Sequence, residues 1–129
     1  MNGLHLTADL YDCGNSALLL DQPALAALCE AEVARVGLSA VSHCWHAFPA
    51  SPAGPGGITG VVLLAESHLA IHTWPERAGV TLDVYVCNFG ADNSLRAERL
   101  LQALLAAFAP RRQQCQRLQR GTQPEPGGA

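Results

Sequence analysis

Residues 60–76 read GVVLLAESHLAIHTWPE, and no other stretch of the chain says as much about its fold. An apolar run ends at Glu66 and a second run begins just after Ser67. The pattern therefore predicts two strands, 58–66 and 68–74, with a tight reversal near Ser67. A carboxylate, a hydroxyl and two imidazoles fall close to this reversal, so the same segment carries a fold signal and a chemical one.

The segments on either side extend a sheet. Alternating apolar and polar residues predict strands at 4–11, 38–48 and 80–87, and a weaker polar pattern predicts an edge strand at 111–118. Between these strands, residues 49–57 are rich in Pro, Gly, Ser and Ala, which is typical of a loop.

Two helices complete the predicted fold. The first begins after the candidate N-cap Asp21 and runs to about Val36, where Gly37 closes it. The second begins at one of the candidate caps 92–94 and stops at Pro110. This order of elements predicts an α+β fold: a two-layer sandwich with a mostly antiparallel sheet and helices packed on one face. The other face of the sheet would be left bare.

Size and composition fit one small globular domain. The chain has 129 residues, of which 49% are hydrophobic and 15% charged. We expect a single domain over residues 1–121 and a disordered, Pro/Gly-rich tail over residues 122–129. This fraction of hydrophobic residues is high for a small protein and favours an oligomer that buries additional surface.

Charge and residue usage exclude several classes of function. The net charge is −3 and no basic cluster precedes the Arg-containing C-terminal region, which argues against a nucleic-acid partner. No apolar run is long enough to cross a membrane and no signal-peptide pattern is present, so we expect a cytoplasmic protein. The five scattered cysteines predict free thiols. The chain contains no lysine, so it cannot hold pyridoxal phosphate as a Schiff base.

The Glu66–Ser67 bond can be interpreted as a bond placed to break itself. The Ser67 hydroxyl would attack the Glu66 carbonyl to form an ester. A base would then remove the Ser67 α-proton, and elimination would leave dehydroalanine, which hydrolyses to a pyruvoyl group. His72 as the base and Thr59 as the hydroxyl that stabilises the oxyanion are the candidates. Turn serines are far commoner than self-processing ones, so the residues alone leave both interpretations open.

Several motifs together resemble the prokaryotic S-adenosylmethionine decarboxylase proenzyme family. They are HLTADLYDC (5–13), ESHL (66–69), IHTWPE (71–76) and LDVYVC (82–87). The similarity runs from about Leu4 to Phe108. It implies cleavage between Glu66 and Ser67, with Ser67 converted to a pyruvoyl group, and a sandwich that forms a homodimer with sites shared across the interface.

The resemblance also assigns roles to individual residues. His72 matches the processing histidine and would share the stacking on adenine with Phe48, while Thr59 stands where the family usually has a processing serine. Cys87 matches the catalytic cysteine that returns a proton to the substrate carbon. An ordinary thiol is largely protonated at neutral pH and can therefore act as this acid. Glu76 matches a carboxylate that holds ribose hydroxyls.

The activity implied by the resemblance is decarboxylation of S-adenosylmethionine for polyamine (spermidine) biosynthesis. The pyruvoyl ketone would condense with the substrate α-amine to give a Schiff base, without pyridoxal phosphate and with no metal required. The implied partners are a small-molecule substrate and a second copy of the chain, with neither nucleic acid nor membrane.

Three features depart from the family pattern and leave the substrate open. Residues 86–90 read VCNFG where the family usually has Thr-Cys-Gly, the loop 49–57 is longer, and Ala47 replaces a usual Arg. The same pyruvoyl mechanism acting on L-ornithine or L-arginine is therefore an alternative.

Two other classes of function remain as alternatives. A non-cleaving regulatory homologue is one, because the methyl group of Thr59 could slow the acyl shift. A metal-binding module is the other, since His43, Cys44 and His46 lie together in the sequence and His68 and His72 fall on a neighbouring predicted strand. In a strand, however, Cys44 and His46 share a face and His43 points away, which is poor geometry for one metal site.

Overall fold

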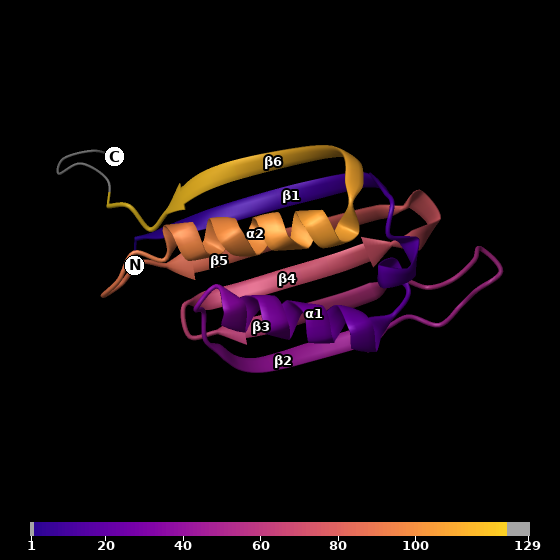
Figure 1. The fold of residues 1–129 in the computed structure, drawn as a ribbon, viewed down its shortest axis with the longest axis horizontal. Coiled ribbons are helices and arrows are strands. Elements are labelled where there is room, and N and C mark those ends of the chain that lie inside the picture. Colours follow the sequence, from indigo (N-terminus) through magenta and orange to yellow (C-terminus); the bar gives the residue numbers. More distant parts are fainter. Residues whose placement is uncertain (1, 124–129) are drawn as a thin grey trace.

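The computed structural model describes residues 2–123, and its elements follow the predicted order (Figure 1). The strands are β1 (Gly3–Cys13), β2 (Ala40–Ala47), β3 (Ile58–Leu64), β4 (Ser67–Trp74), β5 (Gly79–Cys87) and β6 (Pro110–Arg120). The helices are α1 (Gln22–Arg35) and α2 (Ser94–Phe108), and two short 3₁₀ turns, η1 (Ser16–Leu19) and η2 (Pro75–Arg77), were not predicted.

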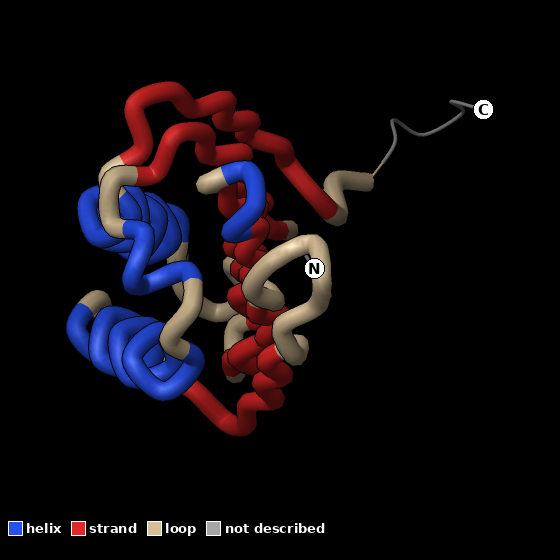
Figure 2. Tube along the Cα trace, turned by 90° about the vertical axis from the view of Figure 1, so that its right-hand side faces the viewer, coloured by secondary structure: helices blue, strands red, loops and turns tan. Residues whose placement is uncertain are grey.

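All six strands form one sheet in the order β2-β3-β4-β5-β1-β6, and every neighbouring pair is antiparallel. Both helices pack on the same face, so the molecule has two layers and one sheet face without helices (Figure 2). The predicted α+β sandwich is therefore confirmed. We call the face away from the helices the open face.

The alternation of side chains explains why one face is buried and the other is open. Along β1 and β5 the apolar residues point to the helices and form the core, while the intervening polar residues lie on the open face. The core is built around these fully buried side chains: Leu4, Leu10, Leu25, Ile58, Leu69, Ile71, Leu100, Leu104 and Phe108. A strip of polar side chains is thereby held on a rigid, well-packed support.

The predicted helix ends are largely confirmed. The Asp21 carboxylate caps α1 by accepting a hydrogen bond from the Ala24 N–H at 3.0 Å, and Gly37 follows the helix with a φ of +90°. The backbone of Asn93 is the N-cap of α2, although its side chain makes no capping hydrogen bond. Pro110 follows the helix and is already the first residue of β6.

The reversal between β3 and β4 is one residue earlier than predicted. Leu64 pairs with Ser67, so Ala65 and Glu66 form a two-residue turn and Ser67 is the first residue of β4. The predicted tail at 122–129 lies mostly outside the described residues. Over the described part of the chain, none of the helices combines the length and apolar character that a membrane span requires.

Candidate active site

The predicted site residues form two groups at opposite ends of β4. Glu66, Ser67 and Cys87 lie together where β4 begins and β5 ends, and we call this group the hairpin end. Thr59 and His72 are paired across β3 and β4, five residues further along, beside the loop 49–57. With Phe48 and Glu76 they form a second group, which we call the loop end.

Ser67 has an unusual backbone conformation. Its φ is +150°, a value that residues other than glycine rarely adopt. The other non-glycine residues with positive φ in the described chain are Asp12, Ala78 and Ala109, whose φ values of 52°, 47° and 51° are the ordinary left-handed conformation. Such a strained residue costs about 1–3 kcal/mol and is most often found at functional sites. The strain is therefore concentrated at the bond predicted to break.

Two backbone N–H groups donate hydrogen bonds to Glu66, one to its carbonyl and one to its side chain. The Glu66 carbonyl accepts a hydrogen bond of 2.6 Å from the Cys87 N–H. The Glu66 carboxylate accepts another from the Ser39 N–H at 3.0 Å. A backbone donor aimed at this carbonyl would stabilise the negative charge that develops on its oxygen during attack by a hydroxyl. Sequence analysis missed both donors, because a backbone N–H leaves no mark in the sequence.

The loop end is a cleft with polar and aromatic walls. Thr59 Oγ1 and His72 Nδ1 lie 3.0 Å apart and are hydrogen-bonded. The cleft has a volume of about 460 Å³ and is lined by the loop 49–57 together with Phe48, Thr59, His72, Trp74 and Glu76. The structure therefore places the predicted stacking residues and the predicted ribose carboxylate around one cavity.

Tight backbone packing fixes the shape of this cleft. A Cβ on Gly57 would lie 2.1 Å from the Thr73 carbonyl oxygen, so only glycine fits there. The Gly57 carbonyl in turn accepts a hydrogen bond from the Phe48 N–H at 2.9 Å. The buried Thr73 hydroxyl accepts from the Ile58 N–H and donates to the Leu19 carbonyl, both at 2.9 Å. These contacts fix the backbone around the cleft and the position of Phe48 in its wall.

The two groups do not meet within one chain. Five residues of β4 separate Ser67 from His72, which is about 16 Å at the usual rise of a strand. The Thr59–His72 pair therefore cannot reach the Ser67 of its own chain without unravelling the hairpin. Within one protomer the predicted site residues therefore form two separate groups.

Cys87 differs from the other thiols in position and burial. Burial, with a smaller contribution from the nearby Glu30 charge, raises the pKa of Cys29 to about 12, and burial also raises the pKa of Cys13. Cys44 and Cys115 are exposed on the two edge strands, far from the hairpin end. Cys87 is partly exposed and sits next to the Glu66 carbonyl.

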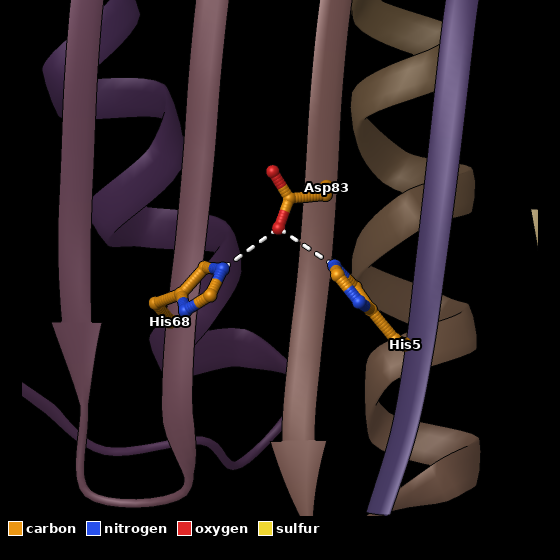
Figure 3. A group of neighbouring side chains, drawn as sticks. All are labelled: His5, His68 and Asp83. Atoms are coloured by element: carbon orange, nitrogen blue, oxygen red, sulfur yellow. Dashed lines mark hydrogen bonds and ion pairs between the residues drawn. The ribbon is translucent and has the colours of Figure 1, made fainter. Parts of the chain in front are cut away.

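The hypothesis of a metal site around His43 gains no support. His43 Nε2 lies 3.3 Å from the Glu30 carboxylate of α1, on the helix side of the sheet. Within the described residues, the only group of three possible metal ligands is His5, His68 and Asp83 (Figure 3). Sequence analysis singled out His68 from this group but did not connect it to the other two, which lie on different strands.

Comparison with known proteins agrees with the geometry. The sequence profile of the family described as S-adenosylmethionine decarboxylase matches residues 4–121. The chain belongs to the S-adenosylmethionine decarboxylase family. Two curated relatives are both named S-adenosylmethionine decarboxylase proenzyme. That of Picrophilus torridus is 34% identical over 94% of this chain and 85% of its own length. That of Persephonella marina is 38% identical over 95% of this chain and 84% of its own length.

A solved structure from the same family has the same fold as this chain. The crystal structure of the adenosylmethionine decarboxylase from Aquifex aeolicus is 37% identical, with a TM-score of 0.79 over 95% of this chain and 93% of that chain. The name proenzyme, carried by the curated relatives, denotes a precursor that has to be processed.

Proposed function

We propose that this chain is a self-processing, pyruvoyl-dependent carboxy-lyase that converts S-adenosylmethionine to decarboxylated S-adenosylmethionine for spermidine biosynthesis. The observation that carries the proposal is the Glu66–Ser67 peptide itself. It combines a φ of +150° at Ser67 with a backbone N–H donated to the carbonyl that Ser67 would attack. Family membership supports the same conclusion independently.

The residues at the hairpin end suit the acyl shift, and His72 from the loop end supplies the base for the elimination. The Ser67 hydroxyl attacks the Glu66 carbonyl carbon, and the Cys87 N–H stabilises the oxyanion. The C–N bond then breaks, which frees the Ser67 amine, leaves an ester and relieves the backbone strain. Removal of the Ser67 α-proton by the His72 of a second copy of the chain expels Glu66 as a carboxylate. Water hydrolyses the resulting dehydroalanine to the ketone and releases ammonia.

The chain fits a pyruvoyl group because it offers a strained serine after a cleavable bond and has no lysine for pyridoxal phosphate. Once formed, the pyruvoyl group supplies an electrophile for the substrate amine and a sink for the electrons released with carbon dioxide. Cys87 donates the proton that replaces the carboxylate. Phe48 and His72 hold the adenine, and Glu76 accepts hydrogen bonds from the ribose hydroxyls. No step requires a metal.

A homodimer would bring the hairpin end of one chain to the loop end of the other. A two-fold symmetric dimer is isologous, so packing open face on open face with antiparallel strands would set the hairpin end of one copy against the loop end of the other. The open face is suited to burial because four large apolar side chains, Tyr11, Leu63, Trp74 and Leu118, are 40–46% exposed along it. Each of the two sites would then combine Ser67 and Cys87 from one chain with Thr59 and His72 from its partner.

The proposal includes a cytoplasmic location. All five cysteines are free in the structure, including the two buried ones, as expected in a reducing compartment.

Intact mass spectrometry of the purified protein tests the proposal directly. We expect two fragments, residues 1–66 and 67–129, with the second beginning in a ketone that hydroxylamine or hydrazine reagents label. Carbon dioxide release should then be measured from S-adenosylmethionine, L-ornithine and L-arginine side by side. A full-length chain that carbonyl reagents do not label would contradict the proposed mechanism. Preference for ornithine or arginine would contradict only the proposed substrate.

A further inference from the structure

Asp83 lies at the centre of a series of side-chain hydrogen bonds that starts beside Ser67. Its Oδ2 oxygen is 2.7 Å from His68 Nε2 and 2.9 Å from His5 Nε2 (Figure 3). His5 Nδ1 is in turn 2.9 Å from a guanidinium nitrogen of Arg120. This series of hydrogen bonds crosses four neighbouring strands, β4, β5, β1 and β6. Its first member, His68, is the residue that follows Ser67.

The direction of each hydrogen bond follows from Arg120. A guanidinium can only donate, so His5 Nδ1 accepts and the His5 proton lies on Nε2, which donates to Asp83. His68 Nε2 donates to the same carboxylate oxygen. Tyr85 packs beside both imidazoles, with ring centroids 5.1 Å from His5 and 5.9 Å from His68, and Arg120 also lies over its ring. The three hydrogen bonds therefore have compatible directions, with Asp83 as the acceptor shared by His5 and His68.

This arrangement favours a hydrogen-bonded anchor over a metal centre. Two imidazoles and a carboxylate are a common ligand set, and their donor atoms lie within 4.8 Å of one another. A ligating histidine, however, usually donates its second ring N–H to an acceptor. At His5 that second nitrogen faces Arg120, which is itself a donor. A cation would have to displace both imidazole protons and the arginine.

We propose that the Asp83–His68 hydrogen bond is an anchor that positions the new N-terminus once the chain has been cut. This inference rests on the proposed function. In the intact chain, the turn at Ala65 and Glu66 holds the start of β4. Cleavage removes that connection, and chain ends fray unless a contact holds them. His68 is then the residue directly attached to the reactive group, and Asp83 ties its side chain to the central strand β5.

Hydrogen exchange of the cleaved enzyme tests the anchor without relying on activity. In Asp83→Ala we expect the amides of residues 68–70 to exchange about tenfold faster than in the wild type, because a charge-assisted hydrogen bond is lost. In the uncleaved Ser67→Ala background, the same change should alter exchange less than about twofold, since the hairpin is intact. Asp83→Asn, which keeps an acceptor oxygen, should restore most of the protection.

Asp9→Ala is the matched control. Asp9 is a carboxylate on the same open face, and of the described residues none hydrogen-bonds to its side chain. It controls for loss of a charge from the surface on which the dimer is proposed to form. Turnover provides a second readout: kcat should fall about tenfold in Asp83→Ala with KM nearly unchanged, because the loop end that binds substrate is untouched.

Each outcome bears on the anchor. Equal exchange in cleaved wild type and cleaved Asp83→Ala would overturn it, and so would equal loosening of cleaved and uncleaved chains, which would mark Asp83 as a general stabiliser. If Asp83→Ala does not fold, His68→Ala, which removes the other partner of the same hydrogen bond, carries the same comparison. One equivalent of zinc bound through His68 and Asp83 would replace the anchor with a metal centre. A wild-type chain that never cleaves would overturn the proposed function and the anchor together.

Discussion

The hairpin end and the loop end are built from different kinds of parts. At the hairpin end the decisive features belong to the backbone: a two-residue turn, a φ of +150° at Ser67 and the Cys87 N–H on the Glu66 carbonyl. At the loop end they are side chains around a cleft, namely Phe48 and His72 among others. In the proposed function, backbone geometry creates the reactive group and side chains select the substrate that reaches it. Substitutions at the two ends should therefore fail in different ways.

The largest effect should come from Ser67→Ala. Without the hydroxyl no ester can form, so we expect a single folded chain of full-length mass with no detectable decarboxylation. Intact mass and circular dichroism check this result. Ser42→Ala, on the exposed edge strand β2, is the control and should cleave normally. Cleavage of Ser67→Ala at residue 66 would remove Ser67 from the mechanism.

Co-expression of two inactive variants tests whether the hairpin end of one chain acts together with the loop end of another. His72→Ala alone should stay uncleaved, because every Ser67 then faces a partner without His72. Paired with differently tagged Ser67→Ala chains, the His72→Ala chain should be cut in the heterodimer, since its partner supplies the imidazole. Mass analysis of each tagged chain gives the answer. No rescue in a heterodimer shown to form would place the two ends in separate sites.

Cys87→Ala should separate processing from turnover. Its backbone N–H remains, so cleavage continues at least in part, while loss of the proton donor should lower kcat about 100-fold or more, as is usual for removal of a general acid. Fragment yield and the rate per pyruvoyl group measure the two effects separately. Cys115→Ala, on the exposed strand β6, serves as the control. Turnover equal to the wild type would assign the proton donor elsewhere.

Glu76→Gln should show the smallest and most selective effect. Replacing a charged acceptor with a neutral one weakens hydrogen bonds to ribose hydroxyls, so KM for S-adenosylmethionine should rise about tenfold. Cleavage and kcat should change little, because the hairpin end is untouched. Steady-state kinetics on fully processed protein measures this. A KM that does not change would mean that Glu76 lies outside the substrate site.

Local signals in the sequence were enough to predict most of the fold. Asp21, Gly37 and Pro110 mark helix ends through interactions with their immediate neighbours, and the alternation in 80–87 identifies one face of a strand without further context. The polar strand β6 was harder to predict, because an edge strand with few apolar residues has a weak alternating pattern.

The site residues came from motifs, but their arrangement in space did not. Strand periodicity puts Ser67 and His72 on opposite faces. The reversal predicted near Ser67 gives its position in the chain but not its φ of +150°. The contact between His5 and Asp83 joins residues 78 positions apart, so only the tertiary pairing of β1 with β5 brings them together. Local patterns carry no information of that kind.

The strand order has a consequence for the protein that the proposed cleavage would produce. A cut after residue 66 leaves β1, β2 and β3 on one fragment and β4, β5 and β6 on the other, yet β1 lies between β5 and β6. Strands of the two fragments therefore alternate within one sheet. The fragments cannot separate without breaking the backbone hydrogen bonds of β1 to both β5 and β6. Once denatured, however, the pieces must find each other by diffusion. Recovery of the mature form should therefore slow on dilution, whereas the uncut precursor regains its tertiary fold at a rate independent of concentration.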